Sequence, residues 1–223
     1  MSAPVVLPEG PWQGLLRHAF TLVDEIAKHG MANPFWTFGG GTVLMLRYGH
    51  RLSKDIDIFV PDPQSLGYVN PRLSDAAAEI TADYEESAQS IKLTLPEGEI
   101  DFVASPNLTG DAFEEWVLWN RPVRVETAAE IVAKKMWHRG DQPTPRDLFD
   151  LCLVIDKEPE ALRTAGRFLV RHRDVFLHEL IANADALSRR FANIRTLGYT
   201  PSYQYCVGLA TEFLSTLPEA SKP

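Results

Sequence analysis

Apolar residues recur along the chain with two different periods, and each change of period predicts a change of secondary structure. Residues 15–30 place apolar side chains three and four positions apart, which predicts an amphipathic helix ending at Gly30. The short runs 34–38 and 55–60 are rich in aromatic and β-branched residues, so we expect two strands there. A short helix over residues 42–49 should connect them.

The next hundred residues continue this mixed pattern. Residues 91–95 and 99–103 alternate apolar and polar side chains on either side of a Pro-Glu-Gly turn, which predicts a β-hairpin. Residues 73–84 have a helical pattern, and residues 121–125 predict one further short strand.

Beyond residue 125 the chain reads as helical throughout, with a break near residues 198–203. Thr127 and Glu130 have the spacing of a capping box, and Thr144 followed by a proline predicts a second helix start. We therefore expect an α+β fold in which a small mixed sheet with flanking helices is followed by a helical C-terminal domain. The expected domains are residues 1–125 and 126–223.

Composition narrows the classes of protein that the chain can represent. Hydrophobic residues make up 45% of the 223 residues, yet no apolar run is long enough for a membrane-spanning helix. The first residues have neither a basic start nor a long apolar block, so we expect no signal peptide. Cys152 and Cys206 lie in apolar stretches and should pack as small hydrophobic residues. A cytoplasmic location is the expectation.

Charge is distributed unevenly along the chain. The net charge is −8, but residues 161–200 carry seven arginines against three acidic residues. Arg163, Arg167 and Arg171 recur at four-residue spacing and are predicted to line one helix face. Such a face either contacts an RNA backbone or forms ion pairs within the protein.

Two aspartates stand at alternate positions of the strand predicted over residues 55–60. Alternation directs Asp55 and Asp57 to one side and the apolar residues between them to the other. Their Cα atoms should lie roughly 7 Å apart, close enough for the carboxylates to repel unless a cation such as Mg²⁺ binds between them. Asp101 can join them if its strand lies alongside. The alternative is a solvated strand edge.

A glycine turn precedes these aspartates. Gly39, Gly40 and Gly41 can bring backbone N–H groups close to a phosphate, and Thr42 adds a hydroxyl at a helix start. A glycine run that merely turns the chain would look the same in the sequence. The combination with the aspartates is more specific than either motif alone.

Together, "GGGT", "DID" and "EIDF" resemble the nucleotidyltransferase superfamily of DNA polymerase β type. More narrowly, residues 38–60 resemble the AbiEii and AbiGii abortive-infection toxins, which also carry a later lysine and an arginine–aspartate pair opening a helix. The resemblance covers about residues 35–155. It implies that the turn binds the triphosphate of an NTP and that the aspartates hold metal ions, which we expect to be two Mg²⁺. The residues implied for these roles are Gly40, Gly41 and Thr42 for the triphosphate, and Asp55, Asp57 and Asp101 for the metals.

The later motif of the resembled toxins falls within residues 130–151. Lys134 and Lys135 both match its lysine, but they diverge by about 100° on a helix. We favour Lys135 as the catalytic lysine and keep Lys134 as a nucleotide-binding candidate. Asp147 matches the aspartate near the active site, although it also suits the first turn of a helix. Arg51 either contacts a phosphate or braces the acidic strand, and Asp150 is expected to be structural.

The expected activity is therefore metal-dependent transfer of an NMP from an NTP to an acceptor. The resemblance implies that the acceptor is a tRNA end and that the protein is a toxin countered by a cognate antitoxin. Two alternatives stay open. One is a non-catalytic binding or regulatory module on the same fold, and the other is a transferase for a small-molecule or protein hydroxyl.

Overall fold

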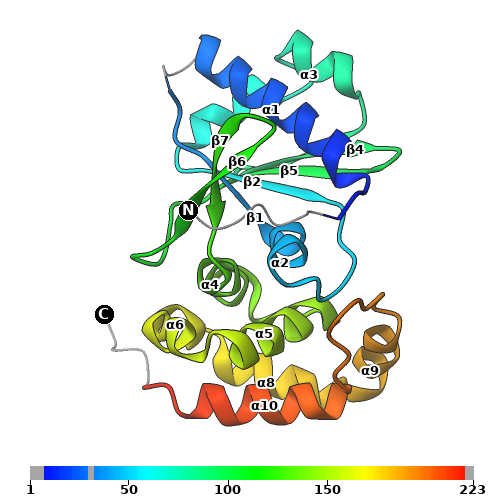
Figure 1. The fold of residues 1–223 in the computed structure, drawn as a ribbon, viewed down its shortest axis with the longest axis vertical. Helices are drawn as coiled ribbons and strands as arrows, with labels where there is room; N and C mark the ends of the chain where they lie inside the picture. The colour runs from blue at the N-terminus through cyan, green and yellow to red at the C-terminus, as the bar shows by residue number, and fades with distance from the viewer. Residues whose placement is uncertain (1–7, 30–32, 219–223) are drawn as a thin grey trace. The chain divides into compact units, whose positions relative to one another are not determined.

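The computed structural model describes residues 8–29 and 33–218, and the helix stop predicted at Gly30 lies outside them. Strands and helices are mixed in the first half, and helices make up the second half (Figure 1). In chain order the elements are α1 (Trp12–His29), β1 (Thr37–Gly39), α2 (Gly40–Tyr48), β2 (Ile56–Val60), the 3-10 helix η1 (Pro63–Val69), α3 (Asp75–Ile80), β3 (Tyr84–Glu86), β4 (Ser90–Leu95), β5 (Gly98–Ala104), β6 (Phe113–Leu118), β7 (Arg121–Glu126), α4 (Ala128–Arg139), α5 (Pro145–Lys157), α6 (Pro159–Thr164), α7 (Gly166–Leu169), α8 (Arg173–Ala182), α9 (Ala184–Ala192) and α10 (Tyr203–Ser215).

The chain forms two compact units, and each is built from more than one stretch of sequence. The first unit comprises Met1–Arg47, Ser53–Pro106 and Glu115–Val125. The second comprises Tyr48–Leu52, Asn107–Glu114 and Glu126–Pro223. Segment 48–52 therefore belongs to the helical unit although it lies between α2 and β2 in sequence.

The first unit is organised around a seven-stranded mixed sheet with the order β3-β4-β5-β2-β1-β7-β6. β2 runs parallel to β5 and antiparallel to β1. Ile56, Ile58 and Val60 of β2 are buried on one face, as the alternation predicts. α1 and α3 lie on one side of this sheet (Figure 1), and α1 contacts both β2 and β5. Asp57 and Phe59 of β2 point to the other face and are only partly buried.

The α+β fold class and the main elements of this unit are confirmed. β4 and β5 pair antiparallel as the predicted hairpin, and β7 is the predicted strand. The helix predicted over residues 73–84 is too long, because Thr81 is extended and its hydroxyl donates to the carbonyl of Thr94. β3 follows instead. β6 was not predicted, because this edge strand lacks a regular alternation of buried and exposed residues.

The helical unit is centred on α5, which contacts α4, α9 and α10 and buries most of its residues. Thr144 caps α5 and Pro145 opens it, as predicted. The capping box predicted for α4 is only half formed. Thr127 accepts from the Glu130 amide, but the Glu130 carboxylate instead accepts from the amides of Leu108 and Thr109.

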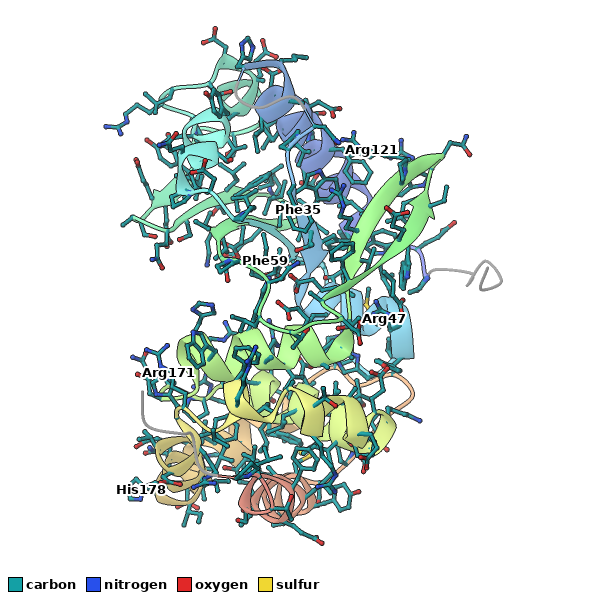
Figure 2. All side chains as sticks on the ribbon, turned by 90° about the vertical axis from the view of Figure 1, so that its left-hand side faces the viewer. Phe35, Arg47, Phe59, Arg121, Arg171 and His178 are labelled. Atoms are coloured by element: carbon teal, nitrogen blue, oxygen red, sulfur yellow. The ribbon has the colours of Figure 1, made fainter. Side chains whose placement is uncertain are left out.

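The three arginines at four-residue spacing do not share one helix face, so that prediction is wrong. α6 ends at Thr164 and α7 begins at Gly166, which separates Arg163 from Arg167. Each arginine instead lies over an aromatic ring. The ring partners of Arg163, Arg167 and Arg171 are Phe213, Phe168 and Trp137, and Arg171 is labelled in Figure 2.

Cys152 and Cys206 are both fully buried, and the Cys152 thiol donates to the carbonyl of Cys206 at 3.2 Å. They pack inside the helical unit, as their apolar surroundings predict. Across residues 8–29 and 33–218, no helix has the length and apolar character needed to cross a membrane.

Candidate active site

Strand pairing in the first unit aligns the site residues in one row across the sheet. Gly39 of β1 is the Cα partner of Asp57 in β2, and Asp57 is the partner of Asp101 in β5. Residues that are paired in this way lie side by side on the same face of a sheet. The structure therefore brings Asp57 and Asp101 together, next to the strand that leads into the glycine turn.

Asp101 lies in an environment that disfavours its charged form. Burial raises its pKa, the carboxylate of Asp57 raises it further, and the ammonium of Lys92 opposes both effects. The result is a pKa of about 7, against an ordinary value of 3.8. Burial and the neighbouring carboxylate of Asp57 thus both disfavour ionisation of Asp101.

Gly40 makes the close approach of the turn to Asp57 possible. Its φ is +75°, and a Cβ atom at this position would lie 1.8 Å from Oδ2 of Asp57. Any side chain here would therefore displace the Asp57 carboxylate, and the backbone conformation itself favours glycine. The glycine turn and the aspartate are fitted to each other.

Thr42 and Asp55 hold the segment between the turn and β2. The buried Thr42 hydroxyl donates to the carbonyl of Asp55 at 2.6 Å and lies 3.1 Å from the hydroxyl of Ser53. Oδ1 of Asp55, just ahead of β2, accepts from the amide of Glu99 at 3.1 Å. Contacts of Thr42 with a triphosphate and of Asp55 with a metal stay predictions.

A second group of candidate residues lies in the helical unit, around Asp150 of α5. The Asp150 carboxylate is fully buried and accepts from Nε and Nη2 of Arg51 at 2.7 and 2.8 Å. Lys135 Nζ donates to it at 2.5 Å, and His50 Nε2 lies 2.9 Å away. Burial alone would raise the pKa of Asp150, but Arg51 and Lys135 hold it well below its usual range. Asp150 is thus the common partner of three nitrogen-bearing side chains.

Asp147 lies one turn before Asp150 and has two functions in the structure. It completes the capping box of α5 with Thr144, and Oδ1 accepts from Arg139 at 2.6 Å and lies 3.3 Å from Lys135 Nζ. Burial opposes ionisation, but Lys135 and Arg139 outweigh it and lower the pKa of Asp147. Lys135 therefore lies between two ionised carboxylates.

Lys134 has a different environment from its neighbour. Its Nζ lies 2.6 Å from the Glu126 carboxylate and 3.5 Å from that of Glu130, and all three side chains are almost completely buried. The two lysines thus diverge as helical geometry requires. Lys134 contributes to a buried ion-pair cluster, whereas Lys135 is partly exposed.

A family model described as nucleotidyl transferase AbiEii toxin of type IV toxin–antitoxin systems matches residues 22–215. The chain belongs to the AbiEii family. It is accordingly a nucleotidyltransferase, and the resemblance found in the motifs is confirmed. No curated protein matches the chain closely enough in sequence to be counted as a relative.

Two solved structures from Helicobacter pylori are similar to this AbiEii-family chain. A candidate nucleotidyltransferase has 16% identity and a TM-score of 0.44, and the match covers 92% of this chain and 96% of that one. The protein JHP933 has 15% identity and a TM-score of 0.46, with 95% and 94% coverage.

The carboxylates of the first unit fit the metal that a nucleotidyltransferase of this family implies. Within the residues that the structure describes, no three His, Cys, Asp or Glu side chains converge as a preformed metal cluster. Asp57 and Asp101 nevertheless offer hard oxygen donors from paired strand positions, and the Asp57 carboxylate contributes to the raised pKa of Asp101. Binding of a divalent cation would relieve the repulsion that raises the pKa of Asp101.

We expect the stability of the metal-free protein to fall between pH 4 and pH 8 because of Asp101. A carboxyl with a raised pKa stabilises the fold fully below its unfolded value of 3.8, and this contribution is lost as the pH rises through about 7. The loss is no more than about 4 kcal/mol. Urea unfolding of the wild type and of Asp101→Asn in EDTA should therefore diverge, with the variant relatively more stable at pH 8 than at pH 5.

Mg²⁺ at pH 8 should stabilise the wild type more than Asp101→Asn, because ligand binding to the folded state adds to its stability. Asp141→Asn changes an exposed carboxylate and serves as the matched control. Parallel pH curves for the wild type and Asp101→Asn would contradict the assigned environment.

The sequence patterns did not indicate several charged residues that the structure places near the candidate sites. His50 is fully buried, and its Nδ1 has no hydrogen-bond partner among the described residues. Glu126 and Lys92 were also passed over. Lys92 alternates with apolar residues in β4, so its shared face with Asp101 could have been found by extending the hairpin register. Nothing local in the sequence signals the partner of His50, which lies 100 residues away.

Proposed function

We propose that this AbiEii-family enzyme transfers an NMP from an NTP to a hydroxyl of an RNA end, such as that of a tRNA, with the help of divalent metal ions. The observation that supports it best is the row of Gly39, Asp57 and Asp101. It places two carboxylates beside a glycine turn that is shaped around one of them. A metal-binding pair next to a phosphate-binding turn suits phosphoryl transfer.

The chain's own residues would divide the work by position. The turn formed by Gly40 and Gly41, with Thr42, would hold the β- and γ-phosphates. Asp55, Asp57 and Asp101 would bind metal ions, which we expect to be two Mg²⁺. When bound, these ions would offset charge on the phosphates.

In the transfer step, the acceptor oxygen forms a bond to the α-phosphorus as the bond to the β-phosphate oxygen breaks. Pyrophosphate leaves with the bonding electrons, and the hydroxyl proton passes to a base. Asp101 is our candidate base, because its carboxylate lies beside Asp57 in the row where the acceptor would meet the α-phosphate.

Lys135 and Asp147, in the helical unit, remain catalytic candidates from the sequence. Lys135 is partly exposed, so its ammonium can exchange a carboxylate for a nucleotide phosphate. Arg51 and Lys134 are nucleotide-binding candidates from the sequence. Their buried ion pairs support a role in positioning the neighbouring groups instead. The division into residues 1–125 and 126–223 stays a prediction from the sequence, with segments 48–52 and 107–114 assigned to the helical unit.

As a member of a type IV toxin family, the protein would act as a toxin with a cognate antitoxin in the cytoplasm. The direct test is incubation with each α-labelled NTP, Mg²⁺ and either total RNA or total protein. Label in the RNA fraction that depends on Asp57 supports the proposal. Label in protein or in small molecules would show that the acceptor is not RNA. Absence of label from every fraction would favour a non-catalytic module.

A further inference from the structure

The row of site residues continues beyond Asp101 into β4, where it reaches a lysine. Lys92 is the Cα partner of Asp101 in the antiparallel pair of β4 and β5, and Glu85 of β3 is its partner on the other side. The order across the sheet is therefore Gly39, Asp57, Asp101, Lys92 and Glu85. Ser90 and Thr94 share the partly exposed face of β4, while the alternate residues are buried.

The position of Lys92 in this row lies on the side away from the glycine turn, which would be the side of the acceptor. Neighbouring strands lie about 4.8 Å apart, so Lys92 is one strand from Asp101, two from Asp57 and three, roughly 14 Å, from Gly39. In phosphoryl transfer the attacking and leaving oxygens lie in line on opposite sides of the phosphorus. If pyrophosphate leaves on the side of the glycine turn, the acceptor hydroxyl enters from the side of Asp101 and Lys92.

We propose that Lys92 binds the acceptor by contacting the phosphodiester next to the attacking hydroxyl of a polynucleotide. This inference rests on the proposed function and extends it to the acceptor side of the same site. A polynucleotide end carries an anionic phosphodiester at a fixed, short distance from its terminal hydroxyl. A cationic small-molecule acceptor would be repelled by an ammonium at this position.

The charged groups around Lys92 leave its ammonium able to exchange partners. Its Nζ lies 3.4 Å from the Glu99 carboxylate. The Lys92 side chain is 33% exposed and the Glu99 side chain is 42% exposed. Asp101, Glu99 and Glu85 all favour the charged lysine, with Asp101 the strongest. Exposed ion pairs of this kind contribute little stability. A cation bound at Asp101 would weaken the attraction of that carboxylate for the Lys92 ammonium, which could then contact a phosphate.

The test measures acceptor binding directly and does not require turnover. A fluorescein-labelled single-stranded RNA with a free 3′-hydroxyl is titrated with the full-length protein and Mg²⁺ at several salt concentrations, and anisotropy is recorded. Lys92→Met should weaken binding about tenfold. It should also reduce the slope of log K against log salt by about 0.7, the loss of one phosphate contact. Lys92→Arg should restore most of the affinity.

Two controls separate acceptor binding from local structure and from net charge. Glu99→Gln removes the ion-pair partner of Lys92 and should leave RNA binding unchanged or stronger. Lys28→Met removes one exposed charge from α1 and should change neither affinity nor slope. The dissociation constant for NTP should be the same in all variants.

Equal RNA affinity of Lys92→Met and the wild type overturns the inference, as does equal weakening by Glu99→Gln. Failure of the wild type to bind RNA also overturns it, since the acceptor is then not a polynucleotide. These results differ from a failure of the proposed function, which would show as absence of label transfer from any NTP to any fraction.

Discussion

Asp57→Asn is expected to abolish nucleotidyl transfer while leaving the protein folded. Asparagine has the shape of aspartate, so its fit against Gly40 is retained, but the charge that binds a divalent cation is lost. Metal ions contribute several kcal/mol to such transition states. The rate should therefore fall on the order of a thousandfold or more. Single-turnover transfer at saturating NTP and Mg²⁺ measures the loss.

The same substitution should raise the melting temperature of the metal-free protein, because Asp57 and Asp101 no longer repel each other. Asp83→Asn, an exposed position in the same unit, is the control for loss of one charge. Asp55→Asn should also abolish transfer if Asp55 is a metal ligand. Wild-type turnover by both Asp55→Asn and Asp57→Asn would exclude the proposed site.

Alanine substitutions of the two adjacent lysines of α4 are expected to have different effects, one on stability and the other on the transfer rate. Lys134→Ala should destabilise the protein by about 3–5 kcal/mol, because it leaves Glu126 and Glu130 buried without their shared cation. Lys135→Ala should leave most of the stability intact, since Asp150 keeps its bidentate pair with Arg51. Its transfer rate should fall roughly a hundredfold if the ammonium contacts phosphate in the transition state.

Urea unfolding and single-turnover transfer on both alanine variants distinguish these effects, and Lys134→Met and Lys135→Met test whether the aliphatic stem is sufficient for stability. Near wild-type transfer by a folded Lys135→Ala protein would remove this lysine from the catalytic proposal. A fully stable Lys134→Ala protein would contradict the buried ion-pair cluster.

Local patterns predicted much of the fold. The alternation in residues 55–60 and 91–103 was sufficient for β2, β4 and β5, because each of these strands buries one face. The same alternation placed Asp57 and, on the condition that the strands were neighbours, Asp101 on one face. The parallel pairing of β2 with β5 supplied that condition, and it is a non-local property that no single segment carries.

What the sequence could not indicate is mostly charge pairing between distant residues. Arg51 and His50 precede their partner Asp150 by about a hundred positions. The sequence therefore predicted for Arg51 either a phosphate contact or a contact with the acidic strand, and neither is the ion pair that the structure has. The arginines after residue 161 looked like one helix face because four-residue spacing was read without the break between α6 and α7. A helix end without a strong glycine or proline signal is difficult to see locally.

Segment 48–52 has a consequence for how this protein can be divided or evolve. It lies between α2 and β2 in sequence, yet its Arg51 and His50 bind Asp150, and Arg51 also pairs with Thr196 as a β-bridge. A fragment that stops at residue 125 would expose a guanidinium and an imidazole that the full chain buries, and the remaining fragment would bury a carboxylate lacking two of its partners. The two halves are thus not interchangeable cassettes: recombination at residue 125 with a relative would need to exchange segment 48–52 as well. During synthesis, Arg51 and His50 cannot pair with Asp150 until the ribosome has made α5.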